Sequence, residues 1–216
     1  MIKYFRRNYL AYVLIFLLIV TLSFFILPAV KVGVNTLHYQ TSIGGTPTEF
    51  QLDGAQSYTY NVWQILAGSV ENLKVLRNSS PDTIKIVFYV PINVWLGFGL
   101  ILLVAAVVLM AFDNRVIRIV GASISLVGTL FSSLFLFLQH LALGYKLPIL
   151  PDSANVYFRE HPEEFVYFKE FQPGIFIALT LIILVGVGCV LLCVYDNYKR
   201  YKFQKEEEAR YLRGGI

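Results

Sequence analysis

Charged side chains are missing from four long stretches of this sequence. No Asp, Glu, Lys, Arg or His occurs from Tyr9 to Val30, from Pro91 to Phe112, from Val120 to Gln139 or from Pro173 to Tyr195. Each stretch is apolar and has the roughly 20 residues that a helix needs to cross a bilayer core. Because lipid offers the backbone no hydrogen-bond partners, such segments are expected to be helical. The absence excludes an ion-coupling or acid–base centre inside the predicted spans.

Cysteine is nearly absent as well. Cys189 and Cys193 are the only two, and both lie in the fourth apolar stretch. The remaining chain therefore has no disulfide and must be held together by packing. Their spacing of four residues puts both on one helix face. They are either small packing residues or acceptors for S-palmitoylation near the inner membrane interface.

Motifs of enzyme chemistry are missing too. The three histidines, His38, His140 and His161, do not form a metal-ligand pattern such as HExxH, and there is no P-loop or GxSxG motif. The sequence therefore predicts no catalytic residue, no metal site and no cofactor. We expect a protein that is not an enzyme.

Basic residues are present, and their distribution predicts an orientation. Apolar residues make up 56% of the 216 residues and charged residues only 15%, a balance typical of membrane proteins. Eleven of the 18 basic residues flank the ends of the apolar stretches, before the first, between the second and third, and after the fourth. Such residues mark the cytoplasmic side. Both termini are predicted to lie on the cytoplasmic side of a plasma membrane, and both long loops on the outer side. No nucleic-acid partner is predicted.

The predicted fold is an all-α membrane protein, a bundle of four transmembrane helices. A small extracytoplasmic domain of short β-strands and short helices comes from its two loops. The first span is expected to be retained, because its apolar run is about twice that of a signal peptide. The predicted segments are a cytoplasmic N-terminus (1–8), spans 9–30, 91–112, 120–140 and 173–195, outer loops 31–90 and 141–172, a cytoplasmic turn (113–119) and a cytoplasmic helical tail (196–216).

Alternating residues predict strands in the first loop. Val32 to Gln40, Thr48 to Leu52 and Ser57 to Trp63 are rich in β-branched and aromatic residues, and Gly-Gly and Asp-Gly pairs separate them. They suggest an antiparallel meander. Trp63 to Arg77 allows a short helix. Ser80-Pro81 fits a helix start, although Ile84 to Tyr89 equally fits a closing strand.

The second loop is expected to be extended from Leu147 to Asp152, because residues before proline avoid the helical region. Pro162-Glu163-Glu164 opens a predicted short helix through Phe171. In the first loop, Asn78-Ser79-Ser80 is a glycosylation sequon. Asn78 is expected to carry glycan if the host glycosylates secreted proteins.

Two spans end alike. Phe112-Asp113-Asn114-Arg115 is similar to Tyr195-Asp196-Asn197-Tyr198-Lys199, and each span begins at a proline 21 or 22 residues before its final aromatic residue. Two explanations are open. The ends are independent stop signals, since a proline at the start and a basic residue at the end both suit a helix, or the chain contains a duplicated helical hairpin.

In topology the chain resembles the claudin-type tetraspan arrangement, with inside termini, a large strand-rich first outer loop and a smaller second one. The claudin loop signature has a tryptophan, a GLW segment and two cysteines. Here Trp63 stands in the segment YNVWQ, and the loops contain no cysteine. The resemblance therefore assigns no residue roles.

Three sets of residues are candidates for function. Small residues allow close helix packing or contact with a partner's helices: Gly97, Gly121, Ser125, Thr129 and Gly186. Aromatic residues of the first loop are candidates for outer recognition: Tyr58, Tyr60 and Trp63. Basic residues after the fourth span are candidates for contacts with lipid headgroups: Lys199, Arg200 and Lys202.

These patterns lead to a main functional hypothesis with two alternatives. We expect a non-enzymatic accessory or scaffold subunit of a larger membrane complex, which recognises other membrane proteins through its outer loops and helix faces and contacts membrane lipids. The alternative is a pore or transporter component formed on oligomerisation, lined by polar residues of the third span: Ser123, Ser125, Thr129, Ser132, Ser133 and Gln139. A membrane enzyme acting on lipid is a third hypothesis.

Overall fold

The computed structural model describes residues 9–43, 46–51, 56–77, 80–142, 144–146 and 165–214. The chain divides into two compact units. The helical unit comprises Met1–Phe24, Val94–Phe135 and Ala178–Ile216, and the sheet unit comprises Phe25–Asn93 and Leu136–Ile177. Helix is the larger part of the described structure, and it is accompanied by a seven-stranded sheet.

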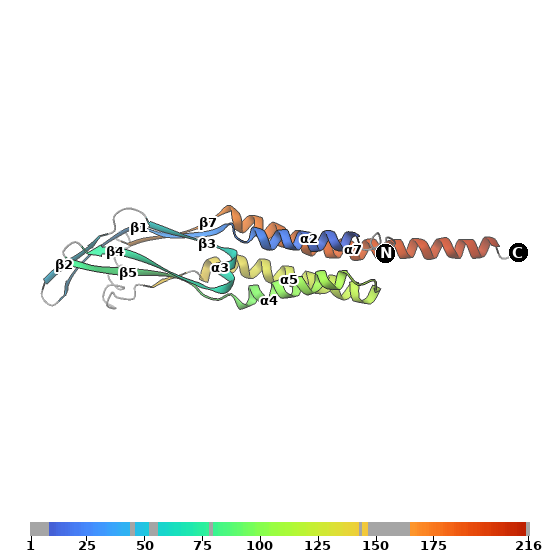
Figure 1. Cartoon of the computed structure of the whole chain (residues 1–216), viewed down its shortest axis with the longest axis horizontal. Helices are drawn as coiled ribbons and strands as arrows, with labels where there is room; N and C mark the ends of the chain where they lie inside the picture. The colour runs from blue at the N-terminus through green and yellow to red at the C-terminus, as the bar shows by residue number, and fades with distance from the viewer. Residues whose placement is uncertain are drawn as a thin grey trace. The chain divides into compact units, whose positions relative to one another are not determined.

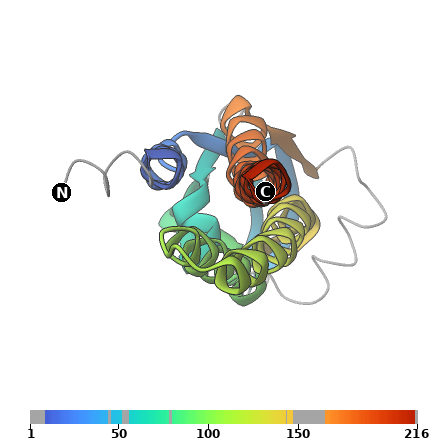
Figure 2. The same ribbon diagram turned by 90° about the vertical axis from the view of Figure 1, so that its right-hand side faces the viewer.

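Four long helices occur in the described ranges: α2 (Tyr9–Phe24), α4 (Val94–Met110), α5 (Arg115–Ala142) and α7 (Pro173–Gly214). Helices α4 and α5 lie side by side (Figure 1, Figure 2), and α2 packs against α4. Helix α7 is unbroken from its N-terminal proline, so the tail continues the helix of the fourth apolar stretch (Figure 1). The helix of the third apolar stretch, α5, begins at Arg115, earlier than the predicted residue 120. It begins there because Asn114 Oδ1 accepts a hydrogen bond from Val116 N at 2.9 Å.

Helices α5 and α7 are long and apolar enough to cross a membrane. In their most apolar windows only 28% and 39% of the residues are buried, unlike the core helix of a soluble protein. Helices α2 and α4 are shorter, with 16 and 17 residues. The predicted first span extended to Val30, but α2 ends at Phe24 and a strand begins at Pro28, which disfavours helix in the residue before it. The structure thus supports a membrane location through two helices.

Strands from both predicted loops join one sheet. They are β1 (Pro28–Ile43), β2 (Thr46–Gln51), β3 (Gln56–Asn61), β4 (Ser69–Arg77), β5 (Ser80–Val90), β6 (Gly144–Lys146) and β7 (Phe165–Phe171). Their order is β3-β1-β2-β4-β5-β6, and β7 also pairs with β1. The predicted meander is wrong in one respect, because β3 pairs with β1 and not with β2.

The long strand β1 organises this sheet. Val32 in its first half pairs with Tyr58 of β3 on one side and with Lys169 of β7 on the other. Its second half, from His38 to Ile43, forms a hairpin with β2. Every second residue of a strand points to the same face. Val30, Val32 and Val34 are all buried in this way, and they form part of the core.

The short helix predicted within Trp63 to Arg77 is confirmed at the start of that stretch, and the remainder is a strand. A short helix, α3 (Val62–Ala67), starts at a capping box in which Asn61 and Gln64 exchange side-chain and backbone hydrogen bonds. It ends because Gly68 has φ +78°, which side chains rarely adopt. Strand β4 follows at Ser69 and pairs with β5. Ser80-Pro81 therefore begins a strand and not a helix.

The helix predicted to run through Phe171 is wrong for the part that the structure describes. Phe165–Phe171 forms β7, with aromatic and β-branched residues typical of strands. Pairing with β1 gives this segment hydrogen-bond partners that its local sequence does not reveal. Residues 147–152, Asn78 and Pro162 lie outside the described residues.

Candidate functional site

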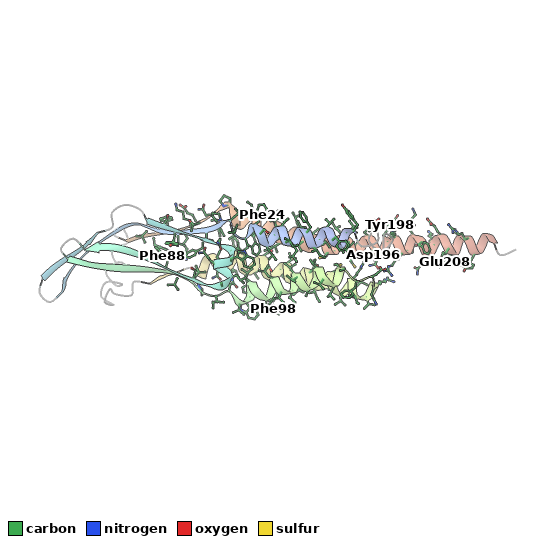
Figure 3. The ribbon with its side chains drawn as sticks, viewed as in Figure 1. Phe24, Phe88, Phe98, Asp196, Tyr198 and Glu208 are labelled. Atoms are coloured by element: carbon green, nitrogen blue, oxygen red, sulfur yellow. The ribbon has the colours of Figure 1, made fainter. Side chains whose placement is uncertain are left out.

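Four ionised side chains meet where the connection between α4 and α5 lies against α7. Arg118 of α5 forms an ion pair with Asp196 of α7, and Figure 3 labels Asp196 on that helix. Arg118 Nη2 lies 3.9 Å from Asp113 Oδ1. Arg200 Nη2 lies 3.1 Å from the same Asp113 oxygen and 3.5 Å from Asp196 Oδ2. We call these two arginines and two aspartates the ion cluster.

Arg118 is the buried member of the ion cluster. Its side chain is only 4% exposed, and burying a charge is costly unless it is paired and hydrogen-bonded. Both conditions are met, because Arg118 Nε also donates to the carbonyl oxygen of Phe112 at 2.7 Å. The guanidinium therefore ties the end of α4 and the start of α5 to α7.

The ion cluster explains why the second and fourth apolar stretches end alike. Each of the similar segments supplies one carboxylate, Asp113 from the first and Asp196 from the second. The asparagines that follow them differ in their roles. Asn114 caps α5, whereas Asn197 Nδ2 lies 3.6 Å from Cys193 Sγ. The two aspartates thus have the same structural role, and this role does not depend on whether the two segments arose by duplication.

A cavity of about 850 Å³ adjoins the ion cluster within the helical unit. Its walls come from the first turn of α2, the α4–α5 connection and one face of α7. Both aspartates and Arg200 belong to the lining, and so does Lys199. This cavity combines charged groups with apolar side chains.

Small residues of the helical unit lie at close approaches between helices. A methyl group added at Gly186 would meet the Thr129 side chain, and one added at Gly121 would lie 3.0 Å from Leu109 Cβ. Ser125 Oγ contacts the carbonyl oxygen of Gly186 at 3.4 Å. Gly97 is half-buried, and the neighbouring contact is made by Gly99, where a methyl group would lie 2.6 Å from Ser132 N.

The candidate recognition aromatics of the first loop differ in exposure. Tyr58 is 37% exposed and Trp63 is 41% exposed, whereas Tyr60 is only 1% exposed. The Tyr60 ring is therefore part of the packed interior and is not available to a partner. Trp63 packs edge-on against Phe25, with 5.5 Å between the ring centroids, so its indole is held in a defined position.

The candidate lipid contacts also differ. Lys199 and Lys202 are exposed, whereas Arg200 is partly engaged by the ion cluster. Cys189 and Cys193 are both buried and reduced. Their burial favours packing over lipidation, because an acyl group needs an accessible thiol.

Gln139 lies in the sheet unit and is buried. It accepts a hydrogen bond from Asn93 Nδ2 at 2.8 Å and donates to the carbonyl oxygen of Pro91 at 3.0 Å. These bonds satisfy both ends of its amide. They tie the residues before α4 to the C-terminal part of α5.

Sequence reasoning missed the ion cluster. Arg118 is one of the eleven basic residues that predict the cytoplasmic side, and Asp113 and Asp196 belong to the two similar span ends, but neither pattern predicts that they pair. The available signal was that two similar Asp-Asn segments lie beside a basic residue at matching helix ends.

Two helices in the described part of the chain have the length and composition of membrane spans. No family model, no curated protein and no solved structure matches this sequence. Function must therefore be argued from the geometry of the chain itself.

Proposed function

We propose that the chain is a four-span membrane protein with cytoplasmic termini and outer loops. The four long helices support this arrangement. The 16 and 17 residues of α2 and α4 span about 25 Å at 1.5 Å per residue, and adjoining apolar residues such as Ile26 and Ile92 lengthen both segments. Large side chains on the helices, including Phe16, Ile101, Leu130 and Leu191, are more than 60% exposed. In a bilayer these surfaces contact lipid.

The protein acts, in this proposal, as an accessory or scaffold subunit of a larger membrane complex. The observation that supports it most is that polar groups of the helical unit bond to other groups within the same unit. The charges of the ion cluster compensate one another, and Ser125 bonds to backbone oxygens at Ala122 and Gly186. These groups hold helices together. Tyr58 and Trp63 of the sheet unit instead present rigid aromatic surface, which is enriched at protein interfaces.

The test is co-purification. The full chain is extracted from its native membrane in mild detergent, and accompanying proteins are identified by mass spectrometry. We expect a reproducible membrane protein partner, whose recovery falls about tenfold when both Tyr58→Ala and Trp63→Ala are introduced. Tyr198→Ala, an exposed aromatic residue of α7, is the control. A monomer without partners would contradict the proposal.

One observation favours the pore as a second candidate. The hydroxyl oxygens of Thr129, Ser132 and Ser133 are buried and have no hydrogen-bond partner among the described residues. Buried hydroxyls normally find a partner, and a water-filled path formed on oligomerisation would supply one. Solute flux into liposomes containing the purified chain tests this candidate. Flux that is abolished by Ser132→Ala would favour it over the scaffold.

A further inference from the structure

The cavity beside the ion cluster is continuous along one face of α7. Its lining residues on that helix, from Leu192 to Glu207, recur every three or four positions, which is the spacing of one helix face. The first turn of α2 forms another wall, with Tyr9 and Leu10. The cavity therefore follows the helix axis across the end of the predicted spans.

The chemistry of the lining changes along this axis. Leu10 and Leu192 line the cavity together with Tyr195, within the predicted spans. Lys199 and Arg200 follow one turn later, outside the predicted fourth span. The apolar section adjoins a charged section in which, within the described part of the chain, Asp113 and Asp196 are paired with arginines and Lys199 is not. This arrangement matches a molecule that has both a hydrocarbon chain and an anionic group.

The charged residues of the lining include Glu207, which lies about two turns beyond Lys199 on α7. Asp113 and Asp196 are compensated by Arg118 and Arg200 in the ion cluster. Lys199 is exposed and takes no part in an ion pair among the described residues. Arg200 also lines the cavity, and its side chain is 40% exposed. Lys199 is thus the uncompensated cation nearest to the apolar section of the cavity, and an anionic group is expected to bind there.

We propose that this cavity binds one glycerophospholipid of the adjoining leaflet. The phosphate diester lies at Lys199 and Arg200, and an acyl chain runs beside Leu10 and Leu192. The volume of about 850 Å³ falls within the range of ligand sites. This inference rests on the membrane placement proposed above, and it adds a lipid site to a protein proposed to bind proteins.

The test is native mass spectrometry of the full chain in mild detergent, titrated with phosphatidylglycerol. We expect one saturable lipid adduct. Lys199→Ala should weaken its binding about fivefold, because a cation near a phosphate contributes about that factor. Lys202→Ala is the matched control, since Lys202 is exposed on the same helix but does not line the cavity. It should leave binding unchanged.

A second pair of variants tests the position of the site on α7. Phe203 lines the cavity and Tyr201 does not, although both are exposed aromatic residues of α7. Phe203→Ala should weaken lipid binding, and Tyr201→Ala should not. Equal weakening by Lys199→Ala and Lys202→Ala would overturn the proposal, because it would show attraction to a diffuse basic surface.

Two further binding measurements identify the source of the phosphate. Phosphatidylcholine with the same acyl chains should also bind, since it carries the same diester. Inorganic phosphate should not displace the lipid, and displacement at equal concentration would overturn the assignment to a lipid. The result is independent of the co-purification experiment, because a chain without protein partners can still carry the adduct. Loss of the adduct would leave the scaffold proposal standing.

Discussion

At the scale of single residues, the buried charge of Arg118 in the helical unit depends on its ion-pair partners. Its guanidinium is almost completely buried, and it lies between carboxylates of two different segments. Removing one partner of a buried ion pair leaves uncompensated charge, which costs more than the pair contributes. Arg200 alone cannot compensate both aspartates.

Arg118→Met should therefore lower the free energy of unfolding by about 3 kcal/mol. The measurement is unfolding of the purified chain in detergent. Arg115→Met is the control, since Arg115 is exposed at the start of the same helix and should change stability by less than about 0.5 kcal/mol. Equal effects of the two substitutions would contradict the role assigned to the ion cluster.

Lys169 links the stability of the sheet unit to pH. Burial lowers the pKa of Lys169 from its ordinary value of 10.5, because desolvation disfavours the ammonium form. Between the lowered pKa and 10.5 the unfolded chain binds more protons than the folded chain. The free energy of unfolding therefore rises with pH across this interval.

Lys169→Met should make the protein more stable than the wild type at pH 7, because it removes the cost of burying the charge. The difference should shrink as the pH rises through the lowered pKa and past 10.5, because the wild-type amine becomes neutral in both states only above 10.5. Thermal unfolding at several pH values measures this, with Lys202→Met as an exposed control. A difference that stays constant with pH would rule out the titration of Lys169 as its cause.

At the scale of elements, α4 and α5 approach closely at two glycines. A methyl group at Gly99 would lie 2.6 Å from Ser132 N, and one at Gly128 would lie 2.9 Å from Leu103 N. Both obstacles are backbone atoms, which cannot move without moving a helix. Close approach of this kind stabilises helix pairs in lipid through packing.

Gly99→Ala should destabilise the helical unit by about 2 kcal/mol, the usual cost of overpacking. Gly188→Ala is the control, because its added methyl group would meet the Leu14 Cδ2 atom, the end of a flexible side chain. Alanine also favours helix by up to about 1 kcal/mol, so the control should be neutral or stabilising. If both variants behave alike, the close packing of α4 on α5 does not stabilise the unit.

The sequence predicted elements where the signal is local. Long apolar runs located α5 and α7, and alternation located the strands β1, β2 and β3. It failed where a distant partner decides the structure. The local sequence of β7 fits an amphipathic helix, and the strand forms because it pairs with β1. Strand β4 likewise forms because it pairs with β5. The ion cluster was missed for the same reason, since Arg118 and Asp196 are 78 positions apart.

At the scale of the whole molecule, we propose a helical unit that spans the membrane and a sheet unit assembled from two loops. The sheet joins residues before α4 with residues after α5, so the four-span proposal requires both loops to lie on the same side of the membrane. The four-span proposal places them outside. It places the α4–α5 connection and the tail of α7 inside.

Labelling of single introduced cysteines in intact cells tests this topology most directly. In a background carrying Cys189→Ala and Cys193→Ala, a membrane-impermeant thiol reagent is applied to Ser57→Cys, Arg115→Cys and Lys205→Cys, three positions that are exposed in the structure. The account predicts that Ser57→Cys is labelled in intact cells, and that the other two are labelled only after permeabilisation. Labelling of both Ser57→Cys and Arg115→Cys from outside would contradict it.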